Sequence, residues 1–309
     1  MRRLSGWLLV ALLIATAACS KTAVAPKAAT AYNKSGARSI SKGDSYALKG
    51  CRKKALLHYF KAVEFFTLSD NQKFLATAYN NIGALYLDEK KPDEALHYFK
   101  SARKLHLFLR TEKEEARALT NTASALLLKG ALAEAAHALE EAEKIQGPSS
   151  STRLARAHLC LKMNEPQKAI DALGTPKTFE KTAPATTSAA SYTLGLGLKA
   201  LEKHSLALAA FEKALAIDTQ RGAFSLMAKD MREIAFCLKK IEKNSRALWY
   251  AGRAFSLFTL ANDAAGQQEL ELFMQELSGT SVKENAPVID HFAKRWRNGK
   301  ALASPCDWP

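Results

Sequence analysis

A pattern of small and large apolar residues recurs along this 309-residue chain every 34 to 40 positions. Each copy holds an alanine, a large apolar residue four positions later and a small residue three positions after that, as in Ala95, Phe99 and Ala102. Side chains spaced by three and four residues lie on one face of a helix. The six copies begin at Ala55, Ala95, Ala135, Ala169, Ala207 and Ala247, the fourth and sixth being looser matches. The chain is therefore predicted to repeat one helical unit.

A second apolar pattern begins twelve residues before each of these alanines. It opens with a small residue and has an apolar residue three positions later, as in Gly83 and Tyr86. Small residues let two antiparallel helices approach closely, and larger ones fill the space beside them. The other copies begin at Gly43, Ala123, Ala157, Gly195 and Ala235. Each repeat is therefore predicted to be a pair of packed helices.

The composition favours an all-α fold. Only 15 Gly and 9 Pro occur in the chain, which leaves few turn formers for the many short strands of a sandwich or a barrel. Apolar residues make up 48% of the sequence, so disorder over most of the chain is excluded.

The repeat resembles the tetratricopeptide repeat, whose W-x2-L-G-x2-Y…A-x3-F…P pattern is matched best by Ile82-Gly83-x2-Tyr86…Ala95-x3-Phe99-x2-Ala102. The first Trp and the terminal Pro of that pattern are missing, and the longer period is similar to the kinesin-light-chain type of repeat. The resemblance covers residues 36–262. It implies an all-α, right-handed superhelical solenoid of about six helix pairs with C-terminal capping helices. In the fourth copy Pro176 replaces the last small residue, so residues 174–184 are predicted to form a loop.

The resemblance also implies a binding surface, because the first helix of each pair lines the concave side in this family. Asn81 and Asn121 lie one repeat apart and are expected to form a ladder whose amides hold a peptide backbone. The alternative is that these amides satisfy polar groups of neighbouring helices. The predicted partner-binding residues are Asn80, Asn81, Arg117, Asn121, Ser124, His158, Tyr192, Lys199, Arg232, Phe236 and Lys239.

Cations gather in the second half of this predicted groove, and they are expected to accept an acidic segment or a C-terminal carboxylate. The full carboxylate clamp of chaperone-binding repeats is not reproduced, because Asn80 stands where the leading Lys is expected. The alternative is that the charges form a solvated face. The cations are Arg117, Lys199, Lys229, Arg232 and Lys239.

The N-terminus has the pattern of an export signal. Two arginines precede an apolar run over residues 4–15, which is shorter than the roughly 20 residues of a membrane span. The following Thr16-Ala17-Ala18-Cys19 resembles the bacterial lipobox, with Cys19 as the lipidated residue and a membrane anchor as the consequence. Residues 1–18 are therefore predicted to be a lipoprotein signal peptide.

Residues 19–35 are predicted to be a flexible tether, because they are rich in Ala, Lys and Thr without apolar periodicity. The absence of Asp at Ser20 resembles lipoproteins sent to the outer membrane. The predicted location is thus the outer membrane, facing the periplasm. Ordinary cleavage after Ala17, which yields a soluble periplasmic or secreted protein, remains the alternative.

The charge balance is basic, with 45 Lys and Arg against 30 Asp and Glu and a formal net charge of +15. The cations are dispersed and no nucleic-acid motif occurs, so nucleic acid is not expected as a partner. Anionic lipid or peptidoglycan are the expected polyanions. No metal-ligand, nucleophile-elbow or phosphate-loop pattern occurs, so no catalytic residue, metal or cofactor is predicted.

Residues 263–309 are predicted to hold a capping helix with Leu270, Phe273 and Met274 on one face, a short basic helix around Trp296, and a tail. Of the cysteines other than Cys19, Cys160 and Cys237 are expected to be packed thiols. If a disulfide forms, Cys237 with Cys306 is the predicted pair. Four apolar residues are expected to pack between helices, with a homodimer contact as the alternative: Phe255, Leu257, Phe258 and Leu260.

Together these features predict a membrane-anchored periplasmic adaptor that holds a protein or peptide in its concave groove. It resembles the repeat lipoproteins that act as pilotins, as docking platforms for peptidoglycan hydrolases or in β-barrel assembly. The alternative is a basic protein that contacts peptidoglycan or anionic lipid through its surface charge.

Overall fold

The computed structural model describes residues 27–278, apart from residues 176 and 262. This part of the chain is all helical, with fourteen α-helices and no strand. The helices are α2 (Lys27–Leu48), α3 (Arg52–Leu68), α4 (Gln72–Asp88), α5 (Pro92–Phe108), α6 (Glu112–Lys129), α7 (Leu132–Gln146), α8 (Ser150–Lys162), α9 (Pro166–Leu173), α10 (Lys177–Glu180), α11 (Pro184–Ala200), α12 (His204–Arg221), α13 (Phe224–Lys240), α14 (Asn244–Leu260) and α15 (Ala264–Ser278).

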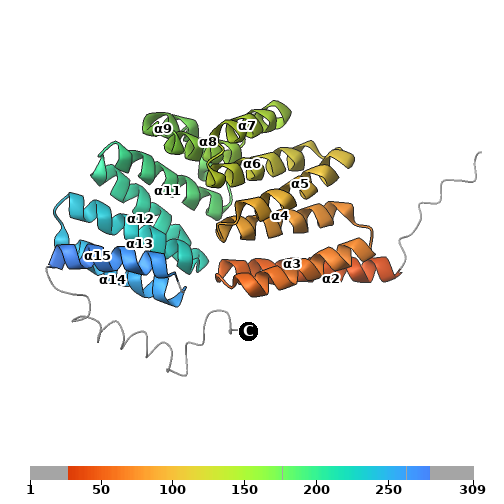
Figure 1. Cartoon of the computed structure of the whole chain (residues 1–309), viewed down its shortest axis with the longest axis horizontal. Coiled ribbons are helices and arrows are strands. Elements are labelled where there is room, and N and C mark those ends of the chain that lie inside the picture. Colours follow the sequence, from red (N-terminus) through yellow and green to blue (C-terminus); the bar gives the residue numbers. More distant parts are fainter. Residues whose placement is uncertain (1–26, 176, 262, 279–309) are drawn as a thin grey trace, which may run out of the picture.

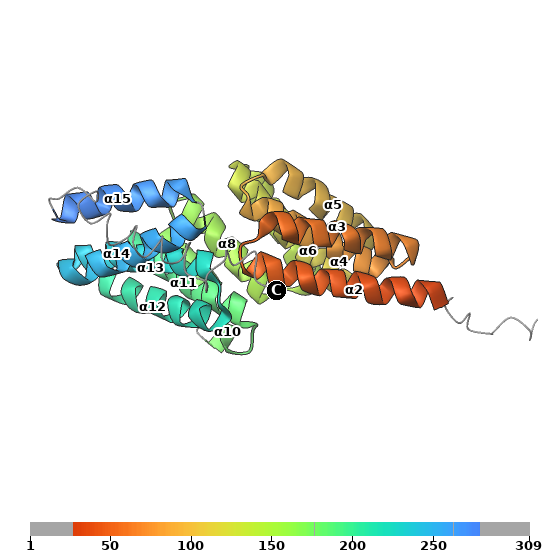
Figure 2. The same ribbon diagram turned by 90° about the horizontal axis from the view of Figure 1, so that it is seen from below.

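The helices pack as consecutive antiparallel pairs that stack into an arc (Figure 1). The pairs are α2/α3, α4/α5, α6/α7, α8/α9, α11/α12 and α13/α14, with α15 packed on the last one. Seen from below, α2–α7 and α11–α15 form two arms on either side of α8 (Figure 2). The predicted all-α superhelix of about six helix pairs is confirmed.

In three of the repeats an aromatic ring of the second helix packs on a glycine of the first. A Cβ atom added to Gly83 would lie 2.6 Å from the ring of Phe99, and one added to Gly195 would lie 2.6 Å from that of Phe211. Gly43 meets the ring of Tyr59 in the same way. Any side chain at these glycines would collide with the ring, so the small residue at this position is required for the pair to close.

The fourth repeat is shorter than the others, since α9 spans only eight residues. The prediction that residues 174–184 form a loop was wrong in part, because α10 lies within this segment and α11 begins at Pro184. The reason is Phe179, which is 6% exposed and packs with Ala157 and Leu173. This side chain fills space that a longer second helix would occupy.

The predicted tether over residues 19–35 extends too far, because α2 already begins at Lys27. Its first turns are fixed on the second helix of the repeat: the ring of Tyr32 stacks on Phe65, and Asn33 accepts hydrogen bonds from Ser69 Oγ and Asn71 Nδ2. The predicted signal peptide and Cys19 lie outside the described residues.

The helix α15 has the structure of a cap. Leu270, Phe273 and Met274 are buried against α14, and Gly266 packs on the ring of Phe258. Phe258 is 2% exposed. Because this side chain is buried within its own chain, it cannot form the homodimer contact that was the alternative prediction. The predicted basic helix around Trp296 and the tail lie outside the described residues.

The cysteines differ from the predicted pairing. Cys237 is buried with a free thiol, and Cys160 is also free. The predicted bond between Cys237 and Cys306 is therefore wrong, because Cys237 is enclosed between helices in the core of the last repeats. Cys51, which is 3% exposed at the start of α3, is disulfide-bonded.

None of the described helices combines the length and the apolar character that crossing a membrane requires.

Candidate binding groove

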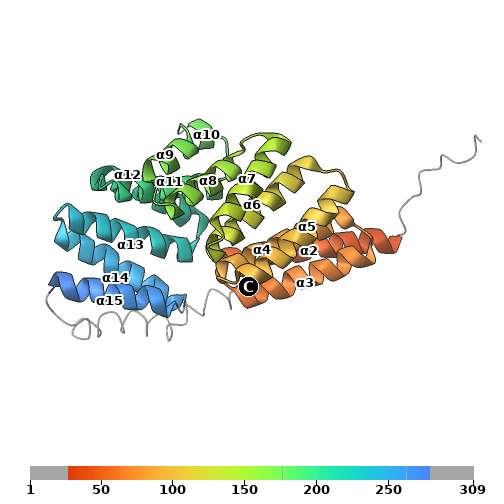
Figure 3. The same cartoon turned by 45° about the horizontal axis from the view of Figure 1, so that its top comes forward.

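The first helices of the repeats, α4, α6, α8, α11 and α13, place the predicted groove residues along the arc (Figure 3). At the N-terminal end the asparagines bind to one another and to α2. Asn121 Nδ2 donates to Asn80 Oδ1 at 3.3 Å, and Asn81 Nδ2 donates to Asp44 Oδ1 at 3.2 Å. The amides thus link adjacent helices, although the pairs are not the predicted Asn81 and Asn121 ladder.

Asn80 itself is 4% exposed, and its Nδ2 has no hydrogen-bond partner within the described residues. Asp44 also accepts a hydrogen bond from Tyr59 at 2.6 Å. Burial and this bond raise the pKa of the Tyr59 hydroxyl far above its usual value, so it remains a donor. These contacts fix the first two repeats in one register.

In the middle of the arc, the predicted contact residues His158 and Ser124 are bonded to other residues of the chain. His158 Nε2 lies 2.8 Å from Thr193 Oγ1 on the next repeat, and burial lowers the pKa of His158. Ser124 donates to the backbone oxygen of Thr120. Arg117 is exposed and takes part in no salt bridge of the described chain, which leaves its guanidinium available to a ligand.

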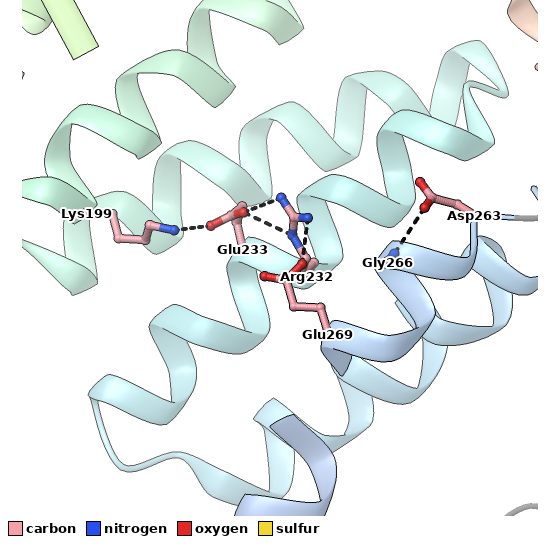
Figure 4. A network of polar contacts seen from close by, with 6 residues as sticks. All are labelled: Lys199, Arg232, Glu233, Asp263, Gly266 and Glu269. Atoms are coloured by element: carbon pink, nitrogen blue, oxygen red, sulfur yellow. Dashed lines mark hydrogen bonds and ion pairs between the residues drawn. The ribbon is translucent and has the colours of Figure 1, made fainter. Parts of the chain in front are cut away.

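At the C-terminal end, Glu233 is the centre of a charged network (Figure 4). This carboxylate is 3% exposed and accepts bonds from Lys199 and from Arg232, the latter at 2.8 Å. Arg232 also donates to Glu269 of α15 at 3.0 Å. The network therefore joins α11, α13 and the cap.

A further cation of this end, Lys239, is held by its neighbours, and Lys199 also lies over an aromatic ring. Lys239 Nζ lies 2.6 Å from Glu276 and 5.4 Å from the centre of the Phe273 ring, whereas Lys199 lies 5.8 Å from that of Phe236. The rings of Phe236 and Phe273 pack edge to face at 4.9 Å. Three of the predicted cations, Lys199, Arg232 and Lys239, are thus already neutralised inside the protein.

A buried acidic pair beside this network was not found from the sequence. Asp218 accepts hydrogen bonds from Ser188 at 2.7 Å and from Arg221 at 2.5 Å. Asp230 is 2% exposed and its Oδ2 has no partner in the described chain. Burial, together with the nearby Asp218, raises the pKa of Asp230 to about 8. An Asp on a helix gives no sequence signal for this, because its burial depends on tertiary packing.

A cavity of about 1190 Å³ lies between the two arms and is lined by residues of the first repeats and of the last ones. Seven cationic side chains and four carboxylates belong to its described lining. Of the predicted groove residues, the cavity brings together Tyr192, Lys229 and Arg232. The described lining residues are Gly50–Lys54, Asp88–Lys91, Tyr192, Ser225, Lys229, Arg232, Phe258, Ala261, Asp263–Gly266 and Glu269.

Part of this charge is balanced locally. Arg52 binds Asp88 at 2.7 Å and Lys91 binds Glu89 at 2.8 Å. Lys53, Lys90 and Lys229, in contrast, form no salt bridge within residues 27–278. These three side chains give the cavity a cationic surplus from both arms.

The basic turns of the first arm were not predicted from the sequence. Residues 51–54 and 88–91 occupy the turns of two successive repeats, so their shared edge could have been read from the repeat register. Their position opposite α13 could not be predicted from the repeat register, because it depends on the curvature that accumulates over the whole arc. Asn80, Asn81, Asn121, His158 and Lys239 lie outside the cavity lining.

A tetratricopeptide repeat family model matches residues 74–147. No curated protein sequence matches the chain. Among solved structures, a STAND signal transduction ATPase with a tetratricopeptide repeat sensor, from Pyrococcus horikoshii, is 14% identical with a TM-score of 0.56. The match covers 96% of this chain and 46% of that one.

A Rap protein complexed with Competence and Sporulation Factor is 12% identical with a TM-score of 0.53, and the match covers 90% of this chain and 88% of the Rap chain. A MamA structure is 21% identical with a TM-score of 0.41, over 61% of this chain and 97% of that one. The structural similarities concern the fold. The repeat match over residues 74–147 and the two structures with TM-scores above 0.5 agree with an all-α superhelix of the tetratricopeptide repeat type.

Proposed function

We propose that this protein is an adaptor that binds an acidic, extended segment of a partner protein in the cavity between its two arms. The observation that carries the proposal is the cationic surplus of a cavity with about 1190 Å³. Lys53 and Lys90 come from the first arm and Lys229 from the second, so a ligand between them contacts both ends of the arc. Charge complementarity of this kind selects acidic partners and accelerates their association.

The cavity also suits the backbone and side chains of a peptide. Tyr192, which is half-buried, contributes aromatic surface next to the lysines, and an aromatic residue beside a few placed charges is the usual composition of such sites. The paired Lys199, Arg232 and Lys239 shape the second arm and are not the main ligands of the partner.

The test is the binding of a fluorescein-labelled deca-glutamate peptide, measured by fluorescence anisotropy at low ionic strength. The double variant Lys53→Ala, Lys229→Ala is expected to bind about tenfold more weakly, because two partly solvated ion pairs contribute roughly 0.5–1 kcal/mol each. The matched control, Lys100→Ala with Lys104→Ala, removes the same charge from exposed positions of α5 and should bind as the unaltered protein does.

An equal loss in both double variants would contradict a defined site. It would favour the second candidate function, a basic protein that contacts peptidoglycan or anionic lipid through its whole surface. The net charge of +15 supports this second candidate. In that case the affinity of both double variants for the peptide should fall strongly as the salt concentration rises.

For the cellular setting, we propose a periplasmic adaptor anchored in the outer membrane through a lipid on Cys19, acting in envelope assembly as pilotins or hydrolase adaptors do. The lipobox-like residues support this, and so does the disulfide at Cys51, since disulfides persist in oxidising compartments. Labelling with an alkyne analogue of palmitate should mark the unaltered protein and leave a Cys19→Ala variant unlabelled. Equal labelling of both would contradict the anchor.

A further inference from the structure

Three buried carboxylates lie on α12 and α13, next to residues of the cavity wall. Asp218 and Asp230 are each 2% exposed, and Glu233 is 3% exposed. Asp230 directly follows Lys229 along α13, and both Lys229 and Tyr192 belong to the cavity lining. A charge on these carboxylates therefore acts on a ligand in the cavity as well as on the core.

Two of the carboxylates are bonded to cations, whereas Asp230 has an oxygen without a partner. Each oxygen of Asp218 accepts a hydrogen bond, one from Ser188 and one from Arg221. Glu233 is bonded by the two cations of its network. Asp230 Oδ2, in contrast, has no hydrogen-bond partner within the described residues. A buried carboxylate without a partner is costly to ionise, so within this group the proton is held on Asp230.

The charges that act on Asp230 come from α12 and from α13 itself. Burial raises the pKa of Asp230 to about 8, Asp218 and Glu233 act in the same direction, and Lys229 opposes them. Other charges of the neighbouring helices have partners of their own. These pairs are Lys199 of α11 with Glu233, Glu269 of α15 with Arg232, Arg246 of α14 with Glu212, and Arg253 of α14 with the ring of Trp249.

The state of Asp230 determines how strongly Lys229 attracts an anion. Lys229 forms no salt bridge within residues 27–278, so its ammonium is available to a ligand while Asp230 is neutral. Once Asp230 is ionised, a negative charge lies beside this ammonium. That charge cancels part of the positive potential of the second arm and repels an acidic ligand.

We propose that Asp230 makes the binding of an acidic segment between the arms depend on pH: the cavity binds its ligand tightly while Asp230 is protonated and more weakly once Asp230 is ionised. This inference rests on the proposed function, because it requires an acidic ligand in the cavity. Binding and protonation are linked, so an anion that binds beside Lys229 favours the transfer of a proton from the solvent to Asp230.

The transition falls in a pH range where the rest of the site keeps its charge. With a pKa of about 8, Asp230 is mostly protonated at pH 6.5 and mostly ionised at pH 9. The described lining contains no histidine. Burial raises the pKa of the Tyr192 hydroxyl far above its usual value, and the charge of Glu233 adds to this. The carboxylates of a glutamate peptide are ionised throughout the range.

The test is the affinity for a tetramethylrhodamine-labelled deca-glutamate peptide, measured by fluorescence anisotropy at pH 6.5 and pH 9 and at constant ionic strength. The unaltered protein should bind about three- to tenfold more tightly at pH 6.5, because one nearby charge is gained at pH 9. Asp230→Asn should bind with the tighter affinity at both pH values. The matched control Asp171→Asn removes the same charge from an exposed position of α9 and should keep the pH dependence of the unaltered protein.

The outcomes separate this inference from the proposed function. Equal pH dependence in Asp230→Asn and in the unaltered protein, or weak binding of Asp230→Asn at both pH values, would overturn the inference and leave the cavity as the binding site. Absence of peptide binding at either pH would overturn both.

A second measurement detects the proton itself and uses the unaltered protein. Isothermal titration calorimetry at pH 8, in two buffers with different enthalpies of ionisation, reports how many protons the protein takes up as the peptide binds. The expected uptake is about 0.2–0.4 proton per peptide, which follows from a three- to tenfold linkage at this pH. Binding without proton uptake would overturn the inference, whereas uptake that disappears in Asp230→Asn would assign the proton to this carboxyl group.

Discussion

The two arms of the arc have the same apolar packing but differ in their polar contacts. In the first arm (α2–α7) Phe99 lies on Gly83, and in the second (α11–α15) Phe211 lies on Gly195 with the same separation. Across the repeats, however, the first arm has amide contacts such as Asn121 with Asn80 and partly exposed ion pairs such as Arg52 with Asp88, whereas the ion pairs of the second arm meet at the buried carboxylate of Glu233. The apolar pattern therefore determines the fold, and the polar residues give each arm its own chemistry.

The shared packing is tested by truncating the ring in each arm. Phe99→Ala and Phe211→Ala should each lower the free energy of unfolding by about 3–5 kcal/mol, because each ring is fully buried. Urea unfolding followed by circular dichroism measures the loss. Phe108→Ala, at a 73% exposed position, is the control and should change stability by less than about 0.5 kcal/mol. A loss in one arm only would refute the equivalence of the two.

The charged network should make the second arm sensitive to a single neutralisation. Glu233→Gln leaves Lys199 and Arg232 without their carboxylate and should cost about 2–4 kcal/mol, since both cations retain some solvent. Asp93→Asn breaks the exposed pair with Lys129 in the first arm and should leave the urea midpoint unchanged. Equal midpoints for the two variants would remove the contrast between the arms.

The buried Asp230 should give the second arm a pH dependence. Its pKa of about 8 in the folded protein exceeds the unfolded value of about 4, so the folded state binds more protons between these values. Stability should therefore fall as the pH rises from about 4 to 8. Asp230→Asn should flatten this slope and stabilise the protein by about 1–3 kcal/mol at pH 8. The measurement is thermal unfolding of both proteins across this pH range. If stability depends on pH equally in the variant and in the unaltered protein, Asp230 is not protonated in the folded state.

The smallest effect is expected for the amide contacts of the first arm. Asn121→Ala removes the bond to Asn80 and should cost about 0.5–1.5 kcal/mol without changing the pH dependence of unfolding. The measurement is urea unfolding at pH 5 and pH 8. A loss that varied between the two pH values would show that the first arm also depends on a titrating group.

The sequence predicted the helix pairs well, because the small and large residues that define them recur at fixed spacing. Gly83 and Phe99 could thus be assigned to one contact before the structure. It did not predict which cations are free. Lys199, Arg232 and Lys239 point to the same face by register, but their neutralisation depends on Glu233, Glu269 and Glu276 from other helices.

Two further features lay beyond the repeat pattern. The helix α2 begins within the predicted tether, because Tyr32 and Asn33 make contacts that no periodicity reveals. The cavity arises from the curvature of the arc, which brings Lys53 and Lys229, 176 positions apart, to one site. Small rotations between successive repeats add up to this curvature, and the sequence of one repeat does not report them.

The most direct test of the account is site-specific photo-crosslinking to the acidic peptide. A benzoylphenylalanine placed at Ser225, in the described cavity lining, is compared with one at Trp249, which is 53% exposed and outside that lining. We expect a crosslink to deca-glutamate at position 225 that excess unlabelled peptide abolishes, and none at position 249. Equal crosslinking at both positions, or none at 225, would contradict a binding site between the arms.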